Sequence, residues 1–401
     1  MRSSEMPRAI VTWARCARHR CKARVVSQGY RSSAPGSGQR RGTGSRTHDI
    51  RAQVAIARVA PSWAEGVRMG RVAQGEMRAT AEPLVIPASD PSVLAAVHEL
   101  APESAVEVLG GTMTRNLHLV DPGLVLRIHP RFVTRNRVMA ERSLKRLVLR
   151  EHGMIAADPL SVRGHETFMV DGRVAELERF VEHTVSTPTW EHYRWLFATL
   201  GRLHRVWAPA SITRPVMSTY GPPGTLRRRL TLLRGRVAEP EAKEQVAYVT
   251  SLVGALGKLW IPARLLPRLV VHGDARLDNL AIGPVGEAVV LDLGFSAVRP
   301  RLHDLAYALA WILLRPDDSG PTWPIDPGEA RRCLAAYEDS SGQPLSGVER
   351  QAFNGYLAGT CLYLTAIAAH VPEPDLLVLE QGNRRMVDIA DHILSRPRLF
   401  T

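Results

Sequence analysis

The sequence predicts an α+β protein with two lobes, a small antiparallel sheet with one helix followed by a mostly helical half. Two patterns support this fold class. Residues 84–181 contain short runs of β-branched and apolar residues separated by glycine-containing turns, with one segment of helical spacing among them. After His183, apolar residues recur mainly at the spacing of helices. The 401 residues are enough to give each lobe its own core.

The predicted order along the chain is a basic tail, an N-lobe and a C-lobe. We place the tail at residues 1–80, the N-lobe at 81–181 and the C-lobe at 182–401. The linker between the lobes is expected near "AELERFV" (175–181). No internal repeat is present that would suggest a solenoid or a propeller.

The formal net charge of +13 arises almost entirely in the tail, which holds 16 of the 52 Lys and Arg residues but 4 of the 39 Asp and Glu residues. This Arg-, Gly- and Ser-rich segment cannot bury enough apolar surface to offset its ordering entropy. We expect it to be disordered, and its composition is similar to that of an organellar transit peptide. Alternatively it is never translated, because Met69 and Met77 both precede the first periodic sequence.

Composition also bears on partners and location. The body has almost no net charge, and the basic residues of the tail are not interleaved with aromatic residues suited to base stacking, so no nucleic-acid partner is expected. No run of about 18 apolar residues occurs, so no membrane span is expected. The four cysteines, Cys16, Cys21, Cys333 and Cys361, fit neither a disulfide framework nor a zinc site, which favours a reducing cytoplasm.

The expected N-lobe elements follow in order. Three strands are expected in "VEVLGGTMTRNLHLVDPGLVLRIHP" (106–130), separated by a glycine turn and an Asp-Pro-Gly turn. The segment "RNRVMAERSLKRLVLREHG" (135–153) is expected to form a helix that stops at its final glycine. A hairpin is expected in "ETFMVDGRVAELERFV" (166–181), because Asp171 and Gly172 suit the left-handed positions of a tight turn.

The C-lobe combines helices with two short strands. The strands are expected within "LVVHGDARLDNLAI" (269–282) and at the start of "AVVLDLGFS" (288–296). Helices are expected at residues 191–208, 305–314, 328–340, 347–370 and 383–395.

Polar residues cluster where these two strands end. The first strand runs into His272, Asp274 and Asn279, which follow the pattern H-x-D-x-x-x-x-N. The second runs into an Asp-Leu-Gly sequence that begins at Asp292. The turn "GPVG" (283–286) between the strands would bring the carboxylates of Asp274 and Asp292 and the amide of Asn279 together at one end of the strand pair.

This set of side chains suits phosphoryl transfer. One carboxylate accepts or orients the hydroxyl of an acceptor, while an amide oxygen and a second carboxylate hold Mg²⁺, which prefers oxygen ligands. Asp274 lies five residues before Asn279, which is the spacing of the kinase catalytic loop. A capped loop would explain a single H-x-D, but four polar positions at this spacing favour a catalytic site.

The motifs "HGDARLDNL" (272–280) and "LDLGFS" (291–296) resemble those of the aminoglycoside phosphotransferase and choline kinase family, small-molecule relatives of the protein kinases. Gly273, where protein kinases carry Arg, favours this group. The resemblance spans roughly residues 84–395 and implies a protein-kinase-like bilobal fold. Further segments are similar to family motifs in the same order: "LGGTMTRN" (109–116), "LVLRIHP" (124–130), "LGRLHRVW" (200–207) and "LHDLAYALA" (302–310).

The resemblance implies roles in the C-lobe. Asp274 and His272 are the candidate catalytic residues, with Asp274 doing the chemistry and His272 holding the loop. Asn279 and Asp292 are the candidate Mg²⁺ ligands. Asp304 is expected to steady the same loop, although a plain helix cap is the alternative.

It also implies nucleotide-binding residues in the N-lobe. Arg127 stands where many kinases have the phosphate-contacting Lys, and the alternative is an exposed strand cation. Glu141 is expected to pair with Arg127 and orient it, and the alternative is a solvated helix carboxylate. Gly110 and Gly111 are expected to let backbone amides approach the phosphates, and a hairpin turn explains them almost as well.

The predicted activity is transfer of the γ-phosphoryl group of ATP, or of GTP, with Mg²⁺, to a hydroxyl of a small molecule. Many relatives have an acidic residue where Gly294 stands, so a second carboxylate at that position is absent. Two alternatives stay open: a metabolite or protein kinase of the same fold, of choline or homoserine type, and a nucleotide-binding module without catalysis. The acceptor is not identified by the sequence.

Overall fold

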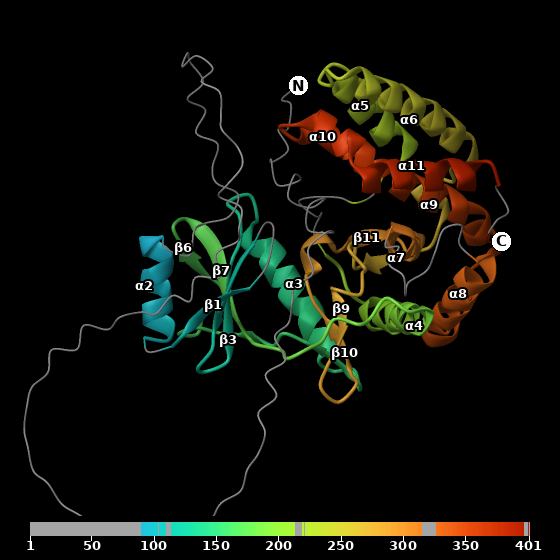
Figure 1. Cartoon of the computed structure of the whole chain (residues 1–401). Coiled ribbons are helices and arrows are strands. Elements are labelled where there is room, and N and C mark those ends of the chain that lie inside the picture. The colour runs from blue at the N-terminus through green and yellow to red at the C-terminus, as the bar shows by residue number, and fades with distance from the viewer. Residues whose placement is uncertain are drawn as a thin grey trace, which may run out of the picture.

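A computed structural model gives the fold of the chain (Figure 1). It describes residues 90–102, 104–109, 114–212, 219, 221–314, 326–396 and 400. The predicted tail and the pair Gly110 and Gly111 lie outside the described residues, and the expectations for them stay predictions.

The N-lobe is built on an antiparallel sheet of strand order β1-β2-β3-β7-β5, in which β6 also pairs with β7. The three strands and the later hairpin expected from the sequence are all present, and the short strand β5 was not anticipated. The strands are β1 (Val106–Leu109), β2 (Arg115–Leu119), β3 (Leu124–Ile128), β5 (Pro159–Leu160), β6 (Phe168–Val170) and β7 (Arg173–Arg179).

The hairpin between β6 and β7 turns at the two residues expected. Asp171 and Gly172 have φ values of 49° and 66°, the left-handed pair that a two-residue type I′ turn requires. The predicted linker (175–181) is wrong in part, because β7 continues to Arg179 and pairs with β3 from Ala175 to Arg179. The linker therefore begins only after this strand.

Two helices cover opposite sides of this sheet (Figure 1). On one side, α2 (Pro91–Leu100) packs Val93 and Val97 against the apolar face of the sheet. On the other side lies α3 (Arg135–Val148), which Thr134 caps by accepting a hydrogen bond from Arg137 N. The helix ends five residues earlier than expected, because a turn after Val148 leads the chain into β4 (Met154–Ala156).

The C-lobe holds the larger core, made mainly by helices. All five predicted helices are present. Three additional helices, α5, α6 and α10, begin with Pro in their first turn, which is a helix start signal in the sequence. The helices are α4 (Trp190–Trp207), α5 (Pro223–Arg234), α6 (Pro240–Leu259), α7 (Leu302–Leu314), α8 (Pro327–Ser341), α9 (Gly347–Ile367), α10 (Pro374–Leu379) and α11 (Gln381–Leu394), with short 3₁₀ turns η2 (Ala263–Leu265), η3 (Leu293–Phe295) and η4 (Ala368–His370).

Four short strands lie between the lobes. β9 (Leu280–Ile282) and β10 (Ala288–Val290) form the hairpin expected around "GPVG". β8 (Arg268–Val271) does not join them but pairs with β11 (Ala297–Pro300). Since Leu291 N donates to Asn279 O (2.8 Å), the loop after β8 is still fastened to the end of β10.

One strand of the N-lobe belongs to a sheet of the C-lobe. β4 pairs in parallel with β10, with Met154 opposite Ala288 and Ala156 opposite Val290. The resulting three-stranded sheet has the order β4-β10-β9. The two lobes are therefore joined by strand pairing as well as by the linker.

Two helical segments of the described chain have the length and apolarity of a membrane span. They are Pro240–Leu265 and Gly347–His370. The second is 94% buried inside the protein over its most apolar window, as expected for a core helix, and the first is 28% buried. The expectation that no segment spans a membrane stays a prediction.

Candidate active site

The segment that the sequence predicts to be the catalytic loop, residues 272–279, is anchored by Asp304 at the start of α7. Asp304 Oδ2 accepts a hydrogen bond from His272 N (2.6 Å) and Oδ1 accepts one from Gly273 N (2.7 Å). His204 Nε2 lies 2.9 Å from Asp304 Oδ2. Burial would raise the pKa of Asp304, but the hydrogen bond and charge of His204 outweigh it and lower the pKa to about 2. Asp304 is thus an ionised acceptor for two backbone N–H groups of the loop.

His272 is fully buried and uses both ring nitrogens. Its Nδ1 accepts from Asp274 N (3.3 Å), so the hydrogen must be on Nε2, which donates to Leu291 O (2.9 Å). The ring therefore ties the catalytic loop to the residue before Asp292. This geometry fits a residue that holds the loop and gives His272 no free nitrogen for proton transfer.

Gly273 cannot be replaced by a larger residue without strain. Its φ is +82°, and a Cβ built there would lie 2.3 Å from Phe295 O. The Thr219 hydroxyl also donates to Gly273 O (2.6 Å). The close approach of the loop to Phe295 explains why glycine follows His272 in this chain.

Asp274 is 1% exposed and is held at both carboxylate oxygens. The Tyr307 hydroxyl donates to Oδ1 (2.7 Å), and Asn279 Nδ2 donates to Oδ2 (2.9 Å). Burial and the charge of Asp274 raise the pKa of Tyr307 well above its ordinary value, so its hydroxyl stays a donor. Hydrogen bonds at both oxygens therefore fix the orientation of the Asp274 carboxylate.

Arg276 and Trp311 complete the wall beside Asp274. Arg276 Nε lies 3.2 Å from Asp274 Oδ1, and its Nη1 lies 3.6 Å from Asp278 Oδ2. The guanidinium also lies over the Trp311 ring, 5.0 Å from its centroid. Arg276 and Asp278, to which the sequence gave no role, form an ion pair. It missed Tyr307 and Trp311, although their spacing after Asp304 on one helix was a signal.

Each of the two candidate metal ligands, Asn279 and Asp292, has side-chain oxygen that no described residue binds. Asn279 Nδ2 donates to Asp274 O (2.8 Å) and to Asp274 Oδ2 (2.9 Å). No described residue donates to Asn279 Oδ1. Asp292 is exposed, and its carboxylate has no hydrogen bond or ion pair within the described chain. An amide and a carboxylate oxygen suit Mg²⁺, which commonly takes few protein ligands together with substrate phosphates. Accordingly, no group of three or more His, Cys, Asp and Glu in the described ranges forms a metal cluster.

Arg127 lies on β3 with its side chain buried beside two carboxylates of β7. Its Nη1 is 3.6 Å from Glu178 Oε1 and 3.9 Å from Glu176 Oε1, and it makes no hydrogen bond to any described residue. Burial opposes its charge, but Glu178, Glu176 and Asp292 outweigh burial and raise the pKa of the guanidinium. Within the described chain Arg127 is therefore ion-paired but not hydrogen-bonded.

Glu141 does not form the expected ion pair with Arg127. Its Oε1 accepts from Arg137 Nε (2.6 Å), one turn earlier on α3. The expectation of an Arg127–Glu141 pair is corrected, because the carboxylates next to Arg127 come from the neighbouring strand. The register that places Arg127 opposite Glu176 in β7 produces this contact.

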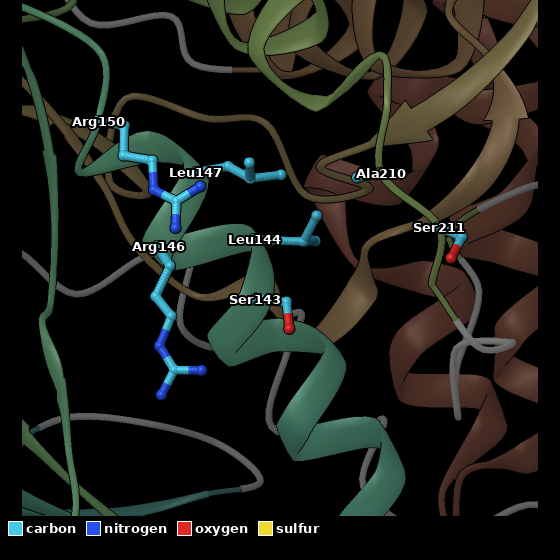
Figure 2. Close-up of a pocket in the computed structure, with 7 residues that line it drawn as sticks. All are labelled: Ser143, Leu144, Arg146, Leu147, Arg150, Ala210 and Ser211. Carbon is cyan, nitrogen blue, oxygen red and sulfur yellow. The ribbon is translucent and has the colours of Figure 1, made fainter.

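Two cavities lie away from these residues. One of about 380 Å³ lies between α3 and the segment after α4, and Figure 2 shows Leu144 and Leu147 directed toward Ala210 across it. The second, of about 280 Å³, is lined by the linker residues 180–182 and by Pro284. None of the proposed catalytic or metal-binding residues lines either cavity.

Comparison with known proteins supports the same assignment. The profile of the phosphotransferase enzyme family matches residues 104–344, whereas no curated protein matches the chain. Among solved structures, an amicoumacin kinase in complex with AMP-PNP and Ca²⁺ is similar with a TM-score of 0.56 and 15% identity, covering 77% of this chain and 94% of that one.

Two further structures have a similar fold. A microcompartment-associated aminopropanol kinase has a TM-score of 0.56 and 16% identity, covering 77% of this chain and 99% of that one. An aminoglycoside phosphotransferase from Alicyclobacillus acidocaldarius subsp. acidocaldarius has a TM-score of 0.55 and 14% identity, covering 82% and 98%. With its lobes, its Asp274 loop and a family profile that matches more than half of its length, the chain belongs to the phosphotransferase enzyme family and has the protein-kinase-like fold of these small-molecule kinases.

Proposed function

We propose that this phosphotransferase moves the γ-phosphoryl group of ATP, held with Mg²⁺, to a hydroxyl group of a small molecule. The observation that carries the proposal is the oriented carboxylate of Asp274, which lies beside two oxygen ligands, Asn279 and Asp292, at adjoining strand ends. The small-molecule acceptor is supported by the similar structures, whose names describe kinases of amicoumacin, aminopropanol and aminoglycosides.

In the proposed reaction, Asp274 orients the acceptor hydroxyl and takes its proton as the new O–P bond forms. The bond from the γ-phosphorus to its bridging oxygen breaks, and ADP leaves. Arg127 donates to the phosphate oxygens of the nucleotide, which is the ligand its unused donors need. Mg²⁺, bound by Asn279 and Asp292, would neutralise charge on the phosphates.

The rival functions differ in what they require of the site. A metabolite kinase of choline or homoserine type, or a protein kinase, would use the same residues and differ in the acceptor. A nucleotide-binding module without catalysis would have no use for a buried, doubly held Asp274. GTP in place of ATP stays open. A cytoplasmic location is also proposed, supported by Cys333 and Cys361, which are buried free thiols.

The test is nucleotide turnover by the full chain against a panel of hydroxylated acceptors, including aminoglycosides, other antibiotics, choline, homoserine and sugars. Asp274→Asn keeps the shape of the side chain and removes the base, so turnover should fall by about 10²–10⁴-fold. Nucleotide binding and the melting temperature serve as controls for an intact site. Turnover by Asp274→Asn equal to that of the wild-type protein would contradict the assigned role, and failure to bind Mg²⁺-nucleotide would contradict the proposed function.

A further inference from the structure

Arg137 of α3 reaches from the N-lobe into the turn that follows Asp292. Its Nη1 donates to Ser296 O (2.8 Å), and its Nη2 donates to Leu293 O (2.8 Å) and Gly294 O (3.1 Å). The residue as a whole is 2% exposed. Three carbonyl groups of the turn, those of Leu293, Gly294 and Ser296, are thus bound by one guanidinium from the other lobe.

Glu141 fixes the orientation of this guanidinium. It accepts from Arg137 Nε at 2.6 Å, and both side chains are about 3% exposed. The fork of Nη atoms is thereby directed away from α3 and toward the turn. Glu141, which the sequence predicted to pair with Arg127, instead holds Arg137.

The backbone at Asp292 needs such support. Asp292 has φ 48° and ψ 71°, in the left-handed region that side chains other than glycine rarely adopt. Conformations of this kind persist when the surroundings determine them. On one side His272 binds Leu291 O (2.9 Å), and on the other Arg137 binds the carbonyls that follow.

We propose that Arg137 is a positioning residue for the metal-holding carboxylate of Asp292, and that Glu141 acts by orienting Arg137. The inference rests on the proposed function, because it assumes that Asp292 holds the metal. It adds that a residue of the N-lobe holds the turn that carries this C-lobe carboxylate. Arg137 itself touches neither substrate nor metal.

The C-lobe contains a matched control for a purely structural role. Arg301 is also buried, donates to Glu349 through Nε (2.7 Å), and binds the carbonyls of Gln343 and Pro344 at 2.9 Å. The two clamps therefore resemble each other in burial and in hydrogen bonds. Only the Arg137 clamp acts on the turn that carries a candidate metal ligand.

The experiment measures binding of AMP-PNP to the full chain as a function of Mg²⁺ concentration, which needs no acceptor and no turnover. Arg137→Lys keeps the positive charge but removes the two Nη donors that bind the turn. The Mg²⁺ concentration for half-maximal AMP-PNP binding should therefore rise about 10- to 100-fold. Saturating Mg²⁺ should restore binding. Arg301→Lys should lower the melting temperature and leave the Mg²⁺ requirement unchanged.

Glu141→Gln is the second, milder variant and carries the test if Arg137→Lys does not fold. It should shift the Mg²⁺ requirement in the same direction by a smaller factor. The inference would be overturned if the folded variants needed no more Mg²⁺ than the wild-type protein and lost melting temperature as Arg301→Lys does. The proposed function would then be intact. Nucleotide binding by the wild-type protein that ignores Mg²⁺ would instead overturn the proposed function, and the inference with it.

Discussion

The two halves of the site differ in how completely the protein itself satisfies their polar groups. In the C-lobe, Asp304 accepts three hydrogen bonds of 2.6–2.9 Å, and Asp274 is held by Tyr307 and Asn279 at 2.7 and 2.9 Å. In the N-lobe, Arg127 is next to its carboxylates only at 3.6 and 3.9 Å. The C-lobe half is therefore preorganised by hydrogen bonds within the protein, whereas Arg127 in the N-lobe half is held by ion pairs.

The largest expected effect comes from breaking the preorganised half. Asp304→Asn removes a buried charge that holds two backbone N–H groups and His204, and should reduce the free energy of unfolding by about 3–5 kcal/mol. Turnover should fall with it, because the loop that carries Asp274 loses its anchor. Urea unfolding of the variant measures the loss.

Asp326→Asn is the matched control for that measurement. Asp326 is exposed at the start of α8 and accepts from Gly328 N (2.7 Å), so its replacement should change stability little. Equal stability of both variants would contradict the view that the C-lobe half depends on a buried, ionised Asp304.

The next effect tests the N-lobe half. Arg127→Met should weaken ATP binding by about 1.5–3 kcal/mol, the contribution of a hydrogen bond to a charged group. The fold should survive, because Glu178 keeps its contact with Lys145 and Glu176 keeps Arg142 at 3.3 Å. Isothermal titration with ATP and with adenosine shows whether the affinity is lost at the phosphates, since adenosine has no phosphate for Arg127 to bind. An equal loss for both ligands would contradict the phosphate contact.

A third comparison isolates the close packing of the catalytic loop. Gly273 and Gly286 both have positive φ values, +82° and +89°, but only Gly273 has backbone atoms within reach of an added Cβ. Gly273→Ala should therefore lower the free energy of unfolding by about 1–3 kcal/mol and Gly286→Ala by less. Thermal unfolding of the two variants would show the difference, and equal losses would mean that Phe295 moves aside freely.

The smallest effect near neutral pH comes from His303. Burial, reinforced by the charge of Arg299, lowers its pKa from 6.5 to about 3. The unfolded chain therefore takes up this proton first, and the stability of the fold should decline as pH falls from 6.5 toward 3. For Asp304 the pKa is lowered from 3.8 to about 2, so the stability it adds is present above pH 3.8 and is lost toward pH 2.

Urea unfolding of the wild-type protein and His303→Gln between about pH 7 and about pH 4 tests this order. The variant should have a flatter stability profile above pH 4, where Asp304 does not yet titrate. Parallel profiles for the two proteins would show that His303 is not the group responsible.

The sequence was informative where chemistry is local and uninformative where it depends on distant contacts. The spacing of Asp274 and Asn279 and the hairpin before Asp292 could be predicted, because turns and strand ends act over a few residues. The partner of Glu141 is also local, since Arg137 lies four residues earlier on α3. The contact of Arg137 with a turn 156 residues further along the chain could not be predicted. The carboxylates beside Arg127 depend on strand register, which no local pattern fixed.

The pairing of β4 with β10 has a consequence for how the protein can be divided. A cut between the lobes after residue 181 would leave β4 in one fragment and its partner in the other, and expose the edge of each. Neither fragment would then carry a complete set of hydrogen-bonded strands. The lobes are thus better regarded as one cooperative folding unit, and we expect a single unfolding transition for both rather than two independent ones.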